Sequence, residues 1–125
     1  MTTGLILFAH GARDPRWAEP FQKFEQRIRG LAPELEVRLC YLELMQPDLA
    51  TAIEELVAVR VRDVRIVPVF LGQGGHVRRD LAGLVAGVQA RFPGVAITCS
   101  PPAGEDEAVL DALARYCLGV TRADQ

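Results

Sequence analysis

The sequence contains only two histidines, three widely spaced cysteines and no long hydrophobic run. The cysteines are odd in number and form no CxxC motif, which favours reduced core thiols over a disulfide framework or a thiolate metal site. The first apolar run covers residues 5–9 and no basic segment precedes it, so we expect neither a signal peptide nor a membrane span. These features predict a cytoplasmic protein.

An excess of charge of either sign is also missing. Fourteen basic and 16 acidic residues give a formal net charge of −2 and an isoelectric point near 5.7. Neither nucleic acid nor a membrane surface is therefore expected as a partner. What is present is the composition of an ordinary globular protein, with 50% hydrophobic and 24% charged residues in 125. We expect a single domain over residues 1–120 and a frayed tail at 121–125.

Short apolar runs alternate with amphipathic segments along the chain. The runs predict strands at residues 4–9, 36–44, 63–71 and 94–100. The amphipathic segments predict helices that begin after Asp14, at 46–60, at about 79–92 and at about 105–118. The first helix carries a stripe at steps of four and three residues, made of Trp17, Phe21, Phe24, Ile28 and Leu31. Four strand–helix repeats predict an α/β fold, with a four-stranded, mainly parallel sheet covered by helices on both faces.

One residue conflicts with a regular central strand. Pro68 has no backbone N–H to donate, so we expect a bulge or a local edge of the sheet there.

Both histidines lie just after predicted strands, His10 directly and His76 in the loop GQGGH. His10 comes after the first strand and His76 after the third, and these two strands are neighbours in a sheet of order 2-1-3-4. Ligands of open parallel sheets bind beyond the carboxyl ends of the strands. Two imidazoles at that edge could converge on one divalent ion, with coordination positions left open, or flank one small molecule. The alternative is two hydrogen-bonded loop histidines.

Further polar and glycine residues lie at the same edge. Glu43 ends the second predicted strand and is a candidate third ligand or proton acceptor, or else a solvated glutamate. The glycines around His76 let the backbone approach a ligand or simply make the turn. Arginines near both histidines could meet acidic groups of a substrate, or form a solvated face; they are Arg13, Arg78 and Arg79.

Three segments carry a family resemblance when they are taken together. They are LILFAHGARDP, YLELMQPDLATAIEEL and VRIVPVFLGQGGHVRRDL, in this order between residues 5 and 81. They contain the patterns H-G-[SA]-R-[DN], E-x-x-x-P and P-x-F-L-x-x-G-G-H-V. In this combination the chain resembles the short CbiX-type class II chelatases, the family of sirohydrochlorin cobaltochelatase. A histidine phosphatase is disfavoured, because Ala9 stands where its R-H-G motif has arginine.

The resemblance implies a chelatase half-domain that inserts a divalent metal into the tetrapyrrole sirohydrochlorin, which is a lyase reaction. Cobalt is the favoured ion, with nickel and iron as alternatives, and it is a substrate rather than a resident cofactor. His10 and His76 match the metal-binding and catalytic histidines, and Glu43 matches the catalytic acidic position. The implied substrate-binding residues are Gly11, Arg13, Gly74, Gly75, Arg78 and Arg79. A homodimer that encloses the ring is expected, and a non-catalytic metal or tetrapyrrole carrier of the same fold is the alternative.

Overall fold

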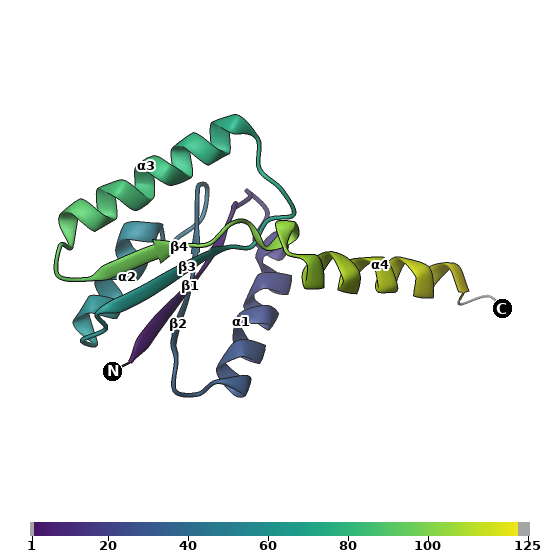
Figure 1. Cartoon of the computed structure of the whole chain (residues 1–125), viewed down its shortest axis with the longest axis horizontal. Coiled ribbons are helices and arrows are strands. Elements are labelled where there is room, and N and C mark those ends of the chain that lie inside the picture. The colour runs from purple at the N-terminus through teal and green to yellow at the C-terminus, as the bar shows by residue number, and fades with distance from the viewer. Residues whose placement is uncertain (1, 123–125) are drawn as a thin grey trace.

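The computed structural model describes residues 2–122 as helices and 3₁₀ turns arranged around one sheet (Figure 1). The elements in chain order are β1 (Thr3–Ala9), η1 (Pro15–Ala18), α1 (Glu19–Leu31), β2 (Glu36–Tyr41), α2 (Leu49–Ala58), β3 (Asp63–Pro68), α3 (Gly75–Arg91), β4 (Ala96–Cys99), η2 (Ala103–Glu105) and α4 (Glu107–Arg122). No helix within the described residues is both long and apolar enough to cross a membrane.

The sheet has the strand order β2-β1-β3-β4, and all its pairs are parallel. The predicted α/β fold with a parallel four-stranded sheet is therefore confirmed. β1 lies in the middle, with Phe8 opposite Cys40 of β2 on one side and Pro68 of β3 on the other. Because the strands are parallel, their carboxyl ends share one edge. The loops after β1, β2 and β3 therefore emerge next to one another.

Apolar side chains of β1 alternate between two buried clusters, one on each face of the sheet. Ile6 and Phe8 are fully buried on the face covered by α2 and α3, whereas Leu7 and Ala9 are buried on the face covered by η1 and α1. Figure 1 shows α2 and α3 on one side of the sheet and α1 on the other. The expectation of helices on both faces is confirmed.

Three predicted boundaries are wrong at the edge where the strands end. β2 ends at Tyr41 rather than at residue 44, because the Tyr41 amide donates to the carbonyl of Pro47 (3.0 Å) and the chain turns. β3 ends at Pro68 rather than at 71. α3 begins at Gly75 rather than at 79, which places His76 in its first turn.

Pro68 does lie at a local edge of the sheet. The pairing of β3 with β4 ends at Ile66 and Cys99, followed only by a bond from the Ser100 amide to the Ile66 carbonyl (2.9 Å). On the other side, Val69 still donates to the Phe8 carbonyl (2.9 Å). Pro68, which has no N–H, therefore lies beyond the last residue of β3 that pairs with β4, where no backbone donor is required.

The helices α1 and α4 differ from expectation in what they bury. In α1, Phe24 is 45% and Leu31 86% exposed, although the spacing predicted a buried stripe. α4 extends to Arg122, four residues beyond the predicted end, and the predicted tail at 121–125 starts inside it. Residues 123–125 lie outside the described residues.

The cysteines are free, as predicted, but only one of them is a core residue. Cys40 is buried in β2, and burial raises the pKa of its thiol to about 12. Cys99 and Cys117 are exposed, so the prediction of core thiols is wrong for these two.

Candidate functional site

His10 and Glu43 are brought together by the ends of the adjacent strands β1 and β2. The Nε2 atom of His10 lies 3.1 Å from Oε1 of Glu43, and the side chains are 45% and 56% exposed. Two backbone bonds align the loops: Leu42 donates to the Ala9 carbonyl (2.9 Å) and Glu43 to the His10 carbonyl (3.1 Å). The pairing of β1 with β2 is thus extended past the sheet, to the residues that carry the functional groups.

Gly11 permits this close approach of the two loops. Its φ of 99° lies in a region that residues with a side chain rarely adopt. A Cβ atom at this position would lie 1.8 Å from the carbonyl oxygen of Glu43. The motif glycine therefore has a structural role next to His10, apart from the substrate-binding role that remains a prediction.

The geometry of the pair leaves one imidazole nitrogen available. An ionised carboxylate can only accept hydrogen bonds, so a neutral His10 carries its hydrogen on Nε2, facing Glu43. Its Nδ1 lone pair is then free to bind a proton or a divalent ion. The Phe70 ring lies against the imidazole, with ring centroids 6.2 Å apart in a T-shaped arrangement.

His76 stands in a second pair with a carboxylate, on α3. Its Nε2 atom lies 3.3 Å from Oδ2 of Asp80, one helical turn later, and its side chain is 83% exposed. Sequence analysis did not identify Asp80 as a site residue, because the helix was expected to start only at residue 79, beyond His76. Within residues 2–122, no three His, Cys, Asp or Glu side chains form a metal-binding group. Convergence of His10 and His76 on one ion therefore stays a prediction.

A hollow of about 450 Å³ is bordered by the acidic residue of each pair. It is lined by Leu42, Glu43, Arg79, Asp80, Gly83 and Leu84. Glu43 belongs to the first pair and Asp80 to the second, so both carboxylates border one space. Arg79 also lines it and brings a positive charge to the same hollow.

The other side of His10 borders a more apolar hollow of about 500 Å³. It is lined by His10, Trp17, Phe21, Val69, Phe70, Leu71, Gly72, Gln73, Gly74 and Val77. The Oε1 atom of Gln73 is buried there without a hydrogen-bond partner among the described residues. Sequence reasoning missed Gln73, since a glutamine in a glycine-rich loop carries no distinctive signal.

The remaining predicted residues are dispersed. Arg78 lines a different hollow, with Leu81 and Ile97, and Arg13 is exposed in the loop after β1. Neither Gly74 nor Gly75 has a positive φ, and a Cβ atom added to either would meet no other described residue within 4 Å. The turn therefore does not require glycine, and the open space above it leaves room for a ligand.

Asp48 fixes the far end of the loop that carries Glu43. Its side chain accepts from the Thr51 amide (2.9 Å) and caps α2. The hydrogen bonds from Thr51 hold the pKa of Asp48 below its usual range.

Comparison with known proteins identifies the family. The chain matches the CbiX family over residues 4–117, a range that includes both histidines, Glu43 and Asp80. The chain belongs to the CbiX family. A crystal structure of a CbiX protein from Marinobacter aquaeolei VT8 superposes with a TM-score of 0.85 at 28% identity, and the match covers 98% of this CbiX chain and 99% of that one.

Relatives of two lengths are similar to this CbiX chain. The sirohydrochlorin cobaltochelatase of Saccharolobus solfataricus is 28% identical over 119 residues, which cover 90% of this chain and 91% of that protein. The sirohydrochlorin ferrochelatase of Bacillus subtilis is 25% identical over 113 residues, but they cover 90% of this chain and only 43% of the relative. SirB of Bacillus subtilis subspecies spizizenii, solved with cobalt, shares the fold with a TM-score of 0.82 at 22% identity, over 96% of this chain and 51% of that one.

Proposed function

We propose that this CbiX chain is a chelatase that inserts a divalent metal ion into sirohydrochlorin, and thus a lyase. The observation that carries the proposal is the family match over residues 4–117, which includes the residues of both histidine–carboxylate pairs. The relatives named as sirohydrochlorin cobaltochelatase and ferrochelatase support this substrate. The metal is consumed in the reaction, so the chemistry needs no resident cofactor.

Cobalt is the metal we propose, with nickel and iron as alternatives. The cobaltochelatase of Saccharolobus solfataricus matches this chain over nearly its full length, which supports cobalt. Imidazole and carboxylate ligands accept all three ions. A site with few protein ligands suits a metal that must be released to the ring, because tight coordination by the protein would oppose its transfer.

His10 and Glu43 are proposed to accept protons from the ring. Metal insertion replaces two pyrrole N–H bonds by metal–nitrogen bonds and releases two protons. Imidazole is a base that works near neutral pH, and the free Nδ1 of His10 takes one proton. Glu43, at 3.1 Å from Nε2, stabilises the imidazolium that forms. The second proton leaves through Glu43 or directly to water, since both side chains are about half exposed.

His76 and Asp80 are proposed to present the metal ion from the opposite side of the 450 Å³ hollow. Their exposure lets an ion arrive from solvent and leave again. Arg79, in the same hollow, attracts the carboxylates of the ring, and Arg13 and Arg78 are proposed as further contacts. The open space at Gly74 and Gly75 lets the macrocycle approach the backbone.

We further propose that two copies enclose the ring as a homodimer. This chain covers 43% of the Bacillus subtilis ferrochelatase and 51% of SirB with nearly its whole length. One copy therefore corresponds in length to about half of such a protein. A second copy would supply the other wall of the tetrapyrrole site.

The test is an anaerobic absorbance assay with sirohydrochlorin and cobalt, nickel or ferrous ions. We expect conversion faster than the protein-free rate, slowed by His10→Ala and by His76→Ala. Glu43→Gln keeps the shape of the side chain but removes its charge, and we expect it to slow insertion by 10²-fold or more, on the order of a lost proton acceptor. Glu54→Gln, the same change on the remote helix α2, is the matched control and should leave the rate unchanged.

A carrier would give a different result. If the ring binds, but wild type and variants all match the protein-free rate, the chelatase proposal is rejected and a carrier function replaces it.

A further inference from the structure

Gln73, in the loop between β3 and α3, holds a buried acceptor that the fold does not use. Its Oε1 atom is buried, yet it accepts no hydrogen bond from any residue between 2 and 122. Buried polar atoms normally have a partner, because an unsatisfied one carries the cost of its lost hydration. The oxygen therefore needs a donor that this part of the chain does not supply.

A second glutamine shows how the chain treats an amide that the fold does need. Gln89 of α3 donates to the carbonyls of Val95 (2.8 Å) and Phe92 (3.3 Å). Its oxygen accepts from the Ile97 amide (3.2 Å). These bonds fasten α3 to β4 and to the turn before it. The Gln73 oxygen forms no such bond within the described residues, so its position is not explained by the fold.

The Gln73 side chain has room to turn. It borders the 500 Å³ hollow of His10 on one side and a hollow of about 480 Å³, with Arg78, on the other. Gly72 and Gly74 flank it, and a Cβ atom added to either would meet no other described residue within 4 Å. Because Oε1 has no partner to lose, the amide can turn toward His10 without breaking a hydrogen bond of this atom.

The hollow of His10 is also where the ring is proposed to approach the chain. His10, the proposed proton acceptor, lines it together with Gly74, where the open space admits the macrocycle. The aromatic side chains of Trp17, Phe21 and Phe70 form further parts of its wall. A ring in this hollow would therefore border the amide of Gln73.

Sirohydrochlorin offers few donors to such an oxygen. Its carboxylates are ionised near neutral pH and can then only accept hydrogen bonds. The remaining donors are the two inner pyrrole N–H groups, and metal insertion removes both. The free ring can therefore satisfy the Gln73 oxygen, whereas the metallated ring cannot.

We propose that Gln73 distinguishes sirohydrochlorin from the metallated product by accepting a hydrogen bond from an inner N–H of the free ring. The proposal rests on the proposed chelatase function and adds a residue that sets its specificity. An unsatisfied buried acceptor weakens binding roughly 5- to 150-fold. Gln73 thus favours binding of the substrate and release of the product from the same hollow.

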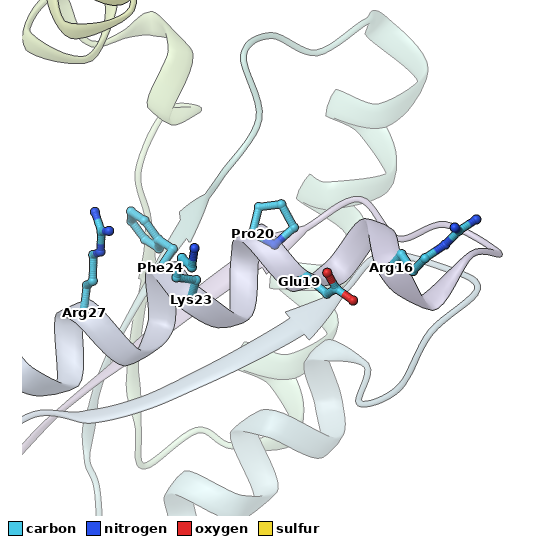
Figure 2. A pocket seen from close by; sticks show the side chains of 6 residues that line it. All are labelled: Arg16, Glu19, Pro20, Lys23, Phe24 and Arg27. Atoms are coloured by element: carbon cyan, nitrogen blue, oxygen red, sulfur yellow. The ribbon is translucent and has the colours of Figure 1, made fainter.

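A basic hollow elsewhere on the molecule could attract the ring but could not make this distinction. Figure 2 shows Lys23 and Arg27 beside Phe24 on α1, around a hollow of about 480 Å³ that Arg16 also lines. Cations at this place would contact the carboxylates of the ring, which metal insertion leaves unchanged. Lys23→Gln therefore serves as a control for general attraction of the ring by charge.

Equilibrium binding without turnover tests the proposal. Trp17 is the only tryptophan of the chain and lines the hollow, so quenching of its fluorescence reports binding. Metal-free protein is titrated under anaerobic conditions with sirohydrochlorin and, separately, with cobalt sirohydrochlorin prepared beforehand. We expect wild type to bind the free ring at least 5-fold more tightly than the metallated ring.

Gln73→Leu removes the acceptor and keeps a side chain of similar size. The ratio of the two dissociation constants should fall by 5-fold or more, and inhibition of the insertion reaction by its product should become stronger. The melting temperature should not fall, because Oε1 gives up no bond within the described residues. Gln26→Leu, the same change at an exposed position of α1, and Lys23→Gln should both keep the wild-type ratio.

An unchanged ratio in Gln73→Leu, or an equal fall in Gln26→Leu, overturns the proposal. If the ratio is unchanged and only the affinity for cobalt ions falls, the donor is a metal-bound water and the proposal is overturned as well. Binding and insertion are measured separately. A shifted ratio without faster insertion by wild type would reject the chelatase function alone, whereas catalysed insertion with an unchanged ratio would reject the role of Gln73 alone.

Discussion

Gly11→Ala tests how the site is built, because it adds one carbon atom between His10 and Glu43. The added Cβ would lie 1.8 Å from the Glu43 carbonyl oxygen, whereas such contacts do not occur below 3.0 Å. The loop after β2 must therefore move by about 1 Å. The movement disrupts the bonds from Leu42 to Ala9 and from Glu43 to His10, each worth about 1 kcal/mol. Alanine at a φ of 99° adds a strain of about 1–2 kcal/mol.

The sum is a destabilisation of about 3–4 kcal/mol, which lowers the melting temperature by roughly 10–15 °C. Thermal unfolding followed by circular dichroism measures it. Activity should fall further, by about 100-fold at a temperature where the variant is folded, because a 1 Å displacement of a reacting group has this effect. The anaerobic insertion assay measures that second loss.

Gly87→Ala is the matched control on α3. No other described residue lies within 4 Å of the added Cβ, and alanine in a helix should raise stability by about 0.5–1 kcal/mol. If Gly11→Ala melts within a degree or two of wild type, the close approach does not constrain the two loops. His10 and Glu43 would then be held together by other contacts, against the account given for the site.

Other predictions concern the cap, pH and thiols. Asp48→Ala removes the bond to the Thr51 amide and should cost about 1 kcal/mol in urea unfolding. Folding lowers the pKa of Asp48, so its contribution to stability is present above the unfolded pKa and is lost as the pH falls through the folded pKa. The free energies of unfolding of wild type and variant should therefore converge once the pH has fallen below the folded pKa. Burial raises the pKa of Cys40 to about 12, so iodoacetamide at pH 8 should label the exposed Cys117 but leave Cys40 unlabelled until the protein unfolds. Arg79→Ala should raise the KM for sirohydrochlorin several-fold and Arg78→Ala less, since only Arg79 shares a hollow with Glu43.

The sheet could be predicted from the sequence because strands that are buried on both faces, such as β1, are continuous runs of apolar residues. The alternation of these strands with helices then predicts a parallel sheet. The ends of β2 and α3 could not be predicted equally well. Tyr41 ends β2 through a bond to Pro47, which lies beyond the predicted strand, and α3 starts at a glycine that sequence rules treat as a helix breaker.

The surface that a helix packs against is harder to predict from the sequence than the helix itself. The spacing in α1 marks Phe24 and Leu31 as buried, whereas the structure leaves both side chains exposed. Periodicity shows that an apolar side exists but not which surface covers it. Similarly, the sequence places His10 and Glu43 at one edge, whereas the contact of His76 with Asp80 depends on where α3 begins.

The central place of β1 has a consequence for synthesis on the ribosome. β1 is made before both of its partners, β2 and β3, and β3 is complete only at Pro68. At about 5–20 residues per second, roughly 3–12 seconds pass between the completion of β1 and the completion of β3. During that time a run of five apolar residues, Leu5 to Ala9, has a free edge that other nascent chains can pair with. Slower translation before residue 68 should therefore increase aggregation, whereas slower translation after β3 should not.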